Sequence, residues 1–165
     1  MNKYNLYLSL ILMITTVGCF NSNVEVSVEH DIKTVISNHD YTMIYVGTEW
    51  CKACHYTFTH QLAPYRKELH DSTGFVVIIY GSAPYVEKLI NETNYKGEIC
   101  TFSSMGGLDK LKANKLLASV LKGYKGVNYM PIIVLCDQQG RVLNFTTNQN
   151  DYLPIDDCIR IIKKQ

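Results

Sequence analysis

A cysteine pair stands where a buried strand gives way to a helix, and this junction most constrains the fold. Residues 41–47 read YTMIYVG, an apolar run of strand length, typical of a strand buried on both faces. The residues WCKACH follow at 50–55, and apolar residues then recur at helical spacing. At a helix start, free N–H groups and the helix dipole favour a thiolate at Cys51, and Cys54 stands one turn later, where it can close a disulfide. The junction therefore predicts a redox-active pair.

The rest of the chain alternates strand and helix patterns. We expect strands at 24–28, 75–80, 98–102, 131–136 and 142–146, and helices at 31–39, 51–69, 85–90, 108–121 and 155–162. Pro64 should kink or break the helix that carries the cysteines. This order predicts an α/β fold in three layers, a mixed central sheet with helices on both faces. No linker divides residues 24–165, so one domain is expected.

The N-terminus is built differently. Lys3 precedes an apolar run from Leu6 to Ile14, and small or polar residues follow, which predicts a signal peptide over 1–18. The residues TVGC at 16–19 resemble a bacterial lipobox, with Thr16 where Leu is usual; the resemblance implies lipidation of Cys19 and a lipid-anchored tether over 19–29 that enters the first strand. We expect an exported, periplasm-facing lipoprotein anchored to the membrane, or alternatively a signal-anchored or secreted protein. Disulfides persist in such compartments.

Composition excludes other classes. The 165 residues carry a formal net charge of +1, so no basic surplus exists to neutralise a phosphate backbone, and nucleic acid is not an expected partner. A chain of this length can bury a real core, so its six cysteines are not needed as staples. We expect Cys136 and Cys158 to be small buried side chains, and Cys100 to be the most exposed of the remaining three.

A second motif, Met130-Pro131, opens the strand 131–136. A proline is tolerated at the first residue of a strand, and a cis bond is plausible there. Through this motif, the WCKAC motif and the turn from Asp137 to Gly140, the chain resembles the thioredoxin superfamily. The resemblance in the order of strands and helices covers residues 24–165. The chain is most similar to membrane-anchored thioredoxin-like proteins of the TlpA type. The resemblance implies a thioredoxin-like sandwich with an inserted segment at about 83–107, before the cis-proline strand.

The resemblance also implies the roles of individual residues. Cys51 is the expected nucleophile and Cys54 the resolving thiol, while Trp50, Met130 and Pro131 contact substrate. The implied enzyme is a thiol–disulfide oxidoreductase acting on protein disulfides or dithiols, in cell redox homeostasis. It needs no cofactor and exchanges electrons with a membrane or periplasmic redox partner. We expect a monomer.

The chain departs from the family at three places. Thioredoxins often keep a buried acid six residues before the first cysteine, where this chain has Tyr45, and Glu49 is the nearest substitute. Met130 replaces the common Thr before the proline. The dipeptide between the cysteines is Lys-Ala, and Lys52 and His55 could favour the thiolate electrostatically.

Two alternatives use the same cysteines. Residues 51–55 match the CxxCH pattern of covalent haem attachment. Cys51, Cys54, His55 and His60 could instead face a soft metal such as copper or zinc. His55 and His60 are poorly placed to share a helix face, and no His occurs after His70, so we expect no bound metal.

Overall fold

The computed structural model describes residues 22–66, 69, 73–145 and 154–164. The expected signal peptide, Cys19 and the beginning of the tether lie outside these residues. Within the described part of the chain, no helix combines the length and the apolar character needed to span a bilayer.

Five strands form one mixed sheet in the order β3-β2-β1-β4-β5. Their bounds are β1 Tyr41–Thr48, β2 Thr73–Tyr80, β3 Ile99–Phe102, β4 Ile132–Asp137 and β5 Val142–Phe145. The first three strands run parallel, whereas β4 is antiparallel to β1 and β5 is antiparallel to β4. The apolar runs at 41–47, 75–80 and 131–136 therefore form the three inner strands, as their sequences predict.

Side chains of β1 alternate between two hydrophobic cores. Ile44 and Val46 point to one core, and Met43 and Tyr45 to the other. All four are at most 1% exposed, which is why this strand has no polar face.

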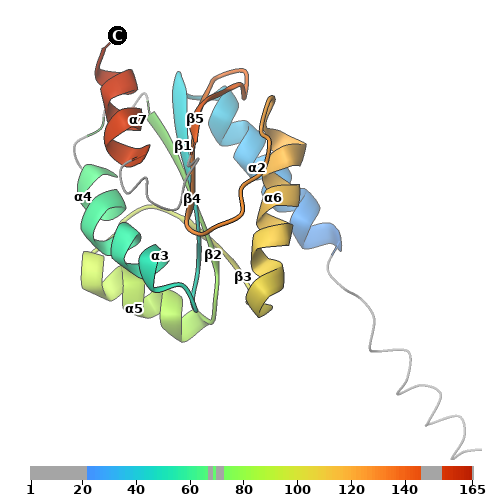
Figure 1. The fold of residues 1–165 in the computed structure, drawn as a ribbon, viewed down its shortest axis with the longest axis vertical. Helices are drawn as coiled ribbons and strands as arrows, with labels where there is room; N and C mark the ends of the chain where they lie inside the picture. Colours follow the sequence, from blue (N-terminus) through green and yellow to red (C-terminus); the bar gives the residue numbers. More distant parts are fainter. Residues whose placement is uncertain (1–21, 67–68, 70–72, 146–153, 165) are drawn as a thin grey trace, which may run out of the picture.

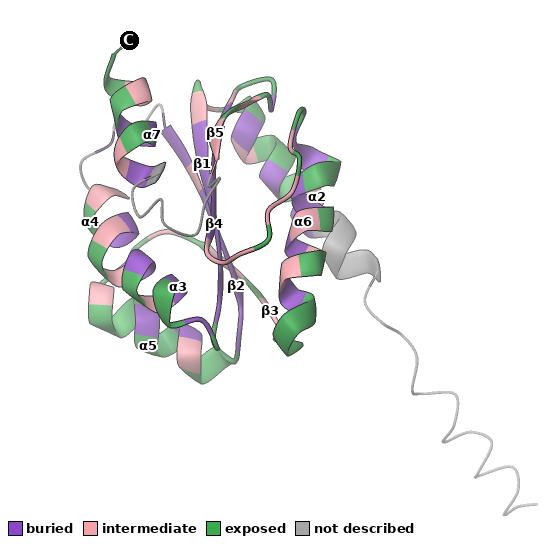
Figure 2. Ribbon diagram, in the orientation of Figure 1, coloured by how far each residue is buried: buried purple, intermediate pink, exposed green. Residues whose placement is uncertain are grey.

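Helices cover both faces of the sheet, so the three-layer α/β architecture is confirmed (Figure 1). One face carries α2 (Ser22–Ser37) and α6 (Asp109–Val120). The other carries the helix that follows β1, with α5 (Ala83–Thr93) and α7 (Pro154–Lys163). The three inner strands, β1, β2 and β4, are almost continuously buried, and each helix turns its buried side to the sheet (Figure 2).

The prediction of a first strand at 24–28 is wrong. Residues 24–28 belong to α2, and the first strand of the sheet is β1. Two of the alternating valines, Val24 and Val28, also begin a spacing of four that continues with Ile32 and Ile36. Val28, Ile32 and Ile36 are all buried in one core. A helical stripe maintained over about three turns outweighs an alternation of five residues, because it buries more apolar surface against the sheet.

The helix after β1 is irregular, as Pro64 predicts. It consists of α3 (Lys52–Thr57), a π-helical turn η1 (Phe58–Leu62) and α4 (Ala63–Arg66). In the wide turn the Ala63 N–H donates to the carbonyl of Phe58, five residues back. Pro64 has no N–H to donate to the carbonyl of His60, so the regular α-helical pattern cannot continue there. The wide turn ends two residues before Pro64.

The segment 83–107 contains α5 and the edge strand β3, followed by the beginning of a 3-10 turn, η2 (Gly106–Leu108). Leu108 and Leu111, within the helix expected at 108–121, are 52% and 66% exposed. Cys136 and Cys158 are fully buried, as expected, and Cys100 is half-buried.

Candidate active site

The sheet brings the cysteine motif and the proline motif together. Strand β1 runs into the cysteines, and the antiparallel strand β4 begins beside its end, with Ile132 opposite Val46. The segment leaving β1 and the segment entering β4 therefore meet at the same end of the sheet. Cys51 and Met130 lie next to one another there although 79 positions separate them in the sequence.

Cys51 is the N-terminal cap of α3. Its backbone is extended (φ −97°, ψ 103°), and its sulfur accepts a hydrogen bond of 3.1 Å from the Cys54 N–H. This bond uses one of the N–H groups that a helix start leaves without a partner. Cys51 is 9% exposed and Cys54 only 1%, so an incoming molecule reaches Cys51 first.

The two thiols are electrostatically unlike. A hydrogen bond from the Cys54 thiol lowers the pKa of Cys51 to about 7, helped by the backbone N–H groups of Cys54 and Ala53 and opposed by burial. Burial raises the pKa of Cys54 strongly, and the hydrogen bond to Cys51 and the charge of its thiolate act in the same direction. Near neutral pH, the outer thiol is thus available as a thiolate while the inner one keeps its proton.

The Met130-Pro131 peptide bond is cis. In its thiol form, Cys51 donates to the Met130 carbonyl, 3.6 Å from its sulfur. The structure therefore brings four of the predicted site residues together: Cys51, Cys54, Met130 and Pro131.

Tyr45 lies beneath the pair from the core side of β1. It is 1% exposed, and its hydroxyl donates to the backbone carbonyl of Cys54 over 2.7 Å. Burial raises its pKa well above the ordinary value, and the nearby Cys54 contributes to the shift. A neutral phenol thus stands where thioredoxins often place an acid.

Thr48, the last residue of β1, is a site residue that sequence reasoning missed. Its hydroxyl is fully buried and, within the described part of the chain, has no hydrogen-bond partner of ordinary geometry. It lies beside the inner thiol: burial raises the pKa of Cys54, and the backbone and hydroxyl of Thr48 partly offset that rise. No sequence pattern signals this role, because a threonine at a strand end is ordinary.

Trp50 is joined to α6. It is 52% exposed, yet its indole N–H donates to the Asp109 carboxylate over 2.9 Å. Asp109 is fully buried and also accepts from the Ser104 hydroxyl and the Met105 N–H, each at 2.6 Å. These donors satisfy the buried carboxylate and attach the cysteine loop to the first turn of α6.

Of the three residues expected to tune the pair, Glu49 and His55 have other contacts. Glu49 accepts from the N–H and hydroxyl of Ser82, at 2.8 and 3.1 Å. The His55 Nε2 lies 3.1 Å from the carboxylate of Glu92 on α5. Lys52 is exposed. The low pKa of Cys51 comes from Cys54 and the backbone rather than from these side chains.

The metal alternative needs His55 and His60 beside the cysteine pair, and both histidines have other contacts. Among the described residues, no group of three or more His, Cys, Asp or Glu side chains is arranged to hold a metal ion. The His60 ring packs against Tyr56, with 4.6 Å between centroids, and His55 is turned towards Glu92.

No protein-family model matches the chain, and no curated protein matches it either. Solved structures do. A DsbF homologue from Corynebacterium diphtheriae superposes with a TM-score of 0.56 at 14% identity, over 78% of this chain and 74% of that one. The thioredoxin domain of a thiol-disulfide oxidoreductase from Bacteroides vulgatus gives 0.53 at 15%, over 78% and 83%. A secreted disulfide oxidoreductase from Mycobacterium tuberculosis gives 0.51 at 13%, over 78% and 85%.

The chain has a thioredoxin fold. In this fold, Cys51 and Cys54 lie at the start of the helix after β1, and the cis Pro131 lies directly before β4. The fold expected from the WCKAC and Met130-Pro131 motifs is thereby confirmed. Likeness to the TlpA type stays a prediction.

Proposed function

We propose that this chain is a thiol–disulfide oxidoreductase that acts on protein disulfides or dithiols. The Cys51 thiolate attacks one sulfur of a substrate disulfide and forms a mixed disulfide, and the other substrate sulfur leaves as a thiolate that takes up a proton. Cys54 then loses its proton and attacks the Cys51 sulfur. This step forms the Cys51–Cys54 disulfide and releases the second substrate thiolate. The substrate gains two electrons, and the reverse sequence passes a disulfide to a dithiol.

The observation that carries the proposal is the difference between the two thiols. Exchange requires a thiolate that meets the substrate first and a second thiol that waits. Cys51 has a pKa of about 7 and is the more exposed of the two, whereas Cys54 is buried and its pKa is raised. No organic cofactor takes part, because a second thiol pair on a redox partner supplies or accepts the electrons.

Exposed apolar side chains next to the pair support a protein substrate. Trp50 and Met105 are 52% and 43% exposed. The Trp50 indole N–H and the Met105 backbone N–H both donate to the Asp109 carboxylate. Leu108, adjacent to Asp109 in sequence, is 52% exposed. Large apolar groups on a surface beside a reactive thiol suit a polypeptide partner better than a small polar disulfide.

We further propose that the protein is exported and held at the membrane through Cys19, as a periplasm-facing lipoprotein. The support is the N-terminal sequence: Lys3, the apolar run from Leu6 to Ile14, and the TVGC residues at 16–19. One structural neighbour is described as secreted. Labelling with a radioactive fatty acid that is lost in Cys19→Ser tests the anchor; label that persists in this variant contradicts it.

Two variants test the exchange mechanism. Cys51→Ser should abolish thiol–disulfide exchange, since serine cannot form the mixed disulfide. Cys54→Ser should keep the first step and lose the second, so it should accumulate mixed disulfides through Cys51 that a reductant releases on a non-reducing gel. Cys100→Ser is the matched control and should exchange like wild type. Unchanged exchange in both Cys51→Ser and Cys54→Ser would show that the mechanism is wrong.

A further inference from the structure

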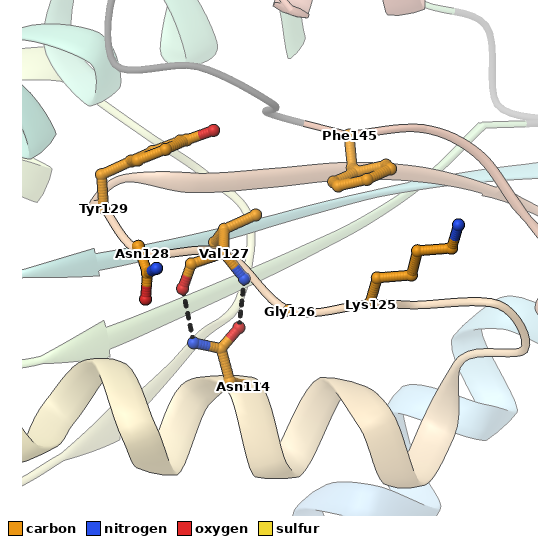
Figure 3. A pocket seen from close by; sticks show the side chains of 7 residues that line it. All are labelled: Asn114, Lys125, Gly126, Val127, Asn128, Tyr129 and Phe145. Atoms are coloured by element: carbon orange, nitrogen blue, oxygen red, sulfur yellow. Dashed lines mark hydrogen bonds between the residues drawn. The ribbon is translucent and has the colours of Figure 1, made fainter.

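One side chain of α6 binds the backbone of the segment that leads to the cis proline. The Asn114 amide N–H donates to the carbonyl of Val127, and its oxygen accepts from the N–H of Val127, each over 2.9 Å (Figure 3). Both polar groups of the side chain thus pair with both polar groups of one residue, as a neighbouring strand would pair with it. Residues 123–131 contain no helix or strand of their own, so this pairing replaces the regular hydrogen bonds they lack.

The segment is shaped to receive Asn114. Gly126 has φ +77°, a conformation that favours glycine, and a Cβ there would lie 3.4 Å from the Asn114 oxygen. The Tyr124 hydroxyl donates to that same oxygen over 2.7 Å. One turn earlier on α6, the Lys110 ammonium donates to the carbonyl of Asn128 over 3.0 Å. Two side chains of one helix thus hold two successive residues of the segment.

The residues that α6 holds, Val127 and Asn128, come shortly before the residue that contacts the reactive sulfur. Met130 comes three residues after Val127, and its carbonyl is 3.6 Å from the Cys51 sulfur. Because this carbonyl is so close to a sulfur that is only 9% exposed, a disulfide that reaches the sulfur comes near the Met130 backbone. The same segment lines a surface pocket of about 460 Å³, together with Asn114 and Phe145 (Figure 3). A shift at Val127 would move both the Met130 backbone and this side of the pocket.

We propose that Asn114 is a positioning residue for the exchange reaction: its paired amide holds the Met130 backbone against Cys51, where that backbone receives the polypeptide chain of a protein disulfide. The inference rests on the proposed function and adds a residue to it that touches neither cysteine. It predicts that Asn114 matters for substrates with a peptide backbone and not for small disulfides.

The experiment compares two reagents that release the same leaving group. One is 5,5′-dithiobis(2-nitrobenzoate), and the other is a ten-residue peptide whose single cysteine is joined to thionitrobenzoate. Attack by Cys51 on either one forms a mixed disulfide and releases coloured thionitrobenzoate. In Asn114→Ala, made in the full-length protein, we expect the rate with the peptide to fall about tenfold and the rate with the small reagent to change by less than about twofold.

Two further variants keep the test decisive if Asn114→Ala folds poorly. Asn114→Asp keeps an acceptor for the Val127 N–H but loses the donation to the Val127 carbonyl, so it should slow the peptide reaction alone, by about threefold. Tyr124→Phe removes one of the two hydrogen bonds that the Asn114 oxygen accepts and leaves both bonds to Val127, so it should react like wild type with both reagents. Ser119→Ala, which removes a side-chain bond elsewhere on α6, is the control for helix damage.

The outcomes separate the inference from the proposed function. Equal losses with both reagents, or full activity of Asn114→Asp with the peptide, would overturn the role of Asn114. A wild-type protein that releases thionitrobenzoate no faster than Cys51→Ser from either reagent would overturn the proposed function itself.

Discussion

The hydroxyl of Tyr45 donates a hydrogen bond to the backbone carbonyl of Cys54 over 2.7 Å. That carbonyl also accepts from the Phe58 N–H, so it keeps a partner if the phenol is lost. Tyr45→Phe should therefore lower the free energy of unfolding by only about 1 kcal/mol. The pKa of Cys51 should stay near 7, because the neutral phenol is not what lowers it. Urea denaturation and thiolate absorbance at 240 nm measure the two quantities, and a Cys51 shift of one pKa unit would contradict this assignment.

The Cys54 thiol should control the ionisation of Cys51. Only the thiolate is alkylated, so the rate of Cys51 labelling by iodoacetamide should rise with pH through a midpoint of about 7 and then level off. In Cys54→Ala the strongest stabilising bond to the thiolate is gone, and the midpoint should move upward, towards the free-thiol value of about 8.5.

Mass spectrometry of the labelled peptide assigns the profile to Cys51. Cys100→Ser is the matched control and should keep the wild-type midpoint, since Cys100 lies on β3 and does not contribute to the low pKa. A Cys54→Ala midpoint that remains near 7 would show that the backbone N–H groups alone suffice.

Thr48 should assist the second step of the exchange. Thr48→Val removes a hydroxyl that partly offsets the rise in the pKa of Cys54, so Cys54 should ionise less readily and the mixed disulfide on Cys51 should persist severalfold longer. Stability should not fall, because while Cys54 keeps its proton the buried hydroxyl has no hydrogen-bond partner of ordinary geometry among the described residues. Quenched-flow trapping of the mixed disulfide measures its lifetime.

Thr42→Val is the control for this prediction. Thr42 lies on the same strand and also buries a hydroxyl with no partner among the described residues, but it stands six residues from Thr48, about 20 Å along the strand. It should match Thr48→Val in stability and wild type in lifetime. Equal lifetimes in both variants would remove Thr48 from the mechanism.

The Asp109 carboxylate should be the main attachment of the cysteine loop. Asp109→Asn replaces one acceptor oxygen with a donor that faces the donors of Trp50 or Met105, so unfolding should become easier by about 1–3 kcal/mol. Trp50 is the sole tryptophan, so its fluorescence should report the change directly. Asp157→Asn, on an exposed ion pair of α7, should leave both stability and fluorescence nearly unchanged.

Much of this molecule could be predicted from its sequence, because the decisive signals are local. Continuous apolar runs mark the inner strands, and a CxxC at a strand-to-helix junction marks the reactive pair. The strand expected at 24–28 failed because five residues are too few to separate an alternating pattern from a helical one when a spacing of four continues to Ile36.

Other site residues could not be found in this way, because their roles depend on distant partners. Asp109 and Asn114 are polar residues within the helix expected at 108–121, and no motif marks them. Their partners Trp50 and Val127 are 59 and 13 positions away, and only the folded chain brings them together. Glu49 shows the converse, since nearness in sequence to the cysteines did not prevent it from binding Ser82.

The wide turn at Phe58–Leu62 fixes the number of residues between the cysteines and Pro64. A π turn holds one residue more than an α turn, and one residue corresponds to about 100° of rotation around a helix axis. The insertion therefore resets the angular phase of α4 relative to α3, so that Leu62 and Ala63 both face the core while Cys54 keeps its own orientation. A deletion of one residue from this turn would restore α-helical geometry only by rotating one half of the helix against the sheet.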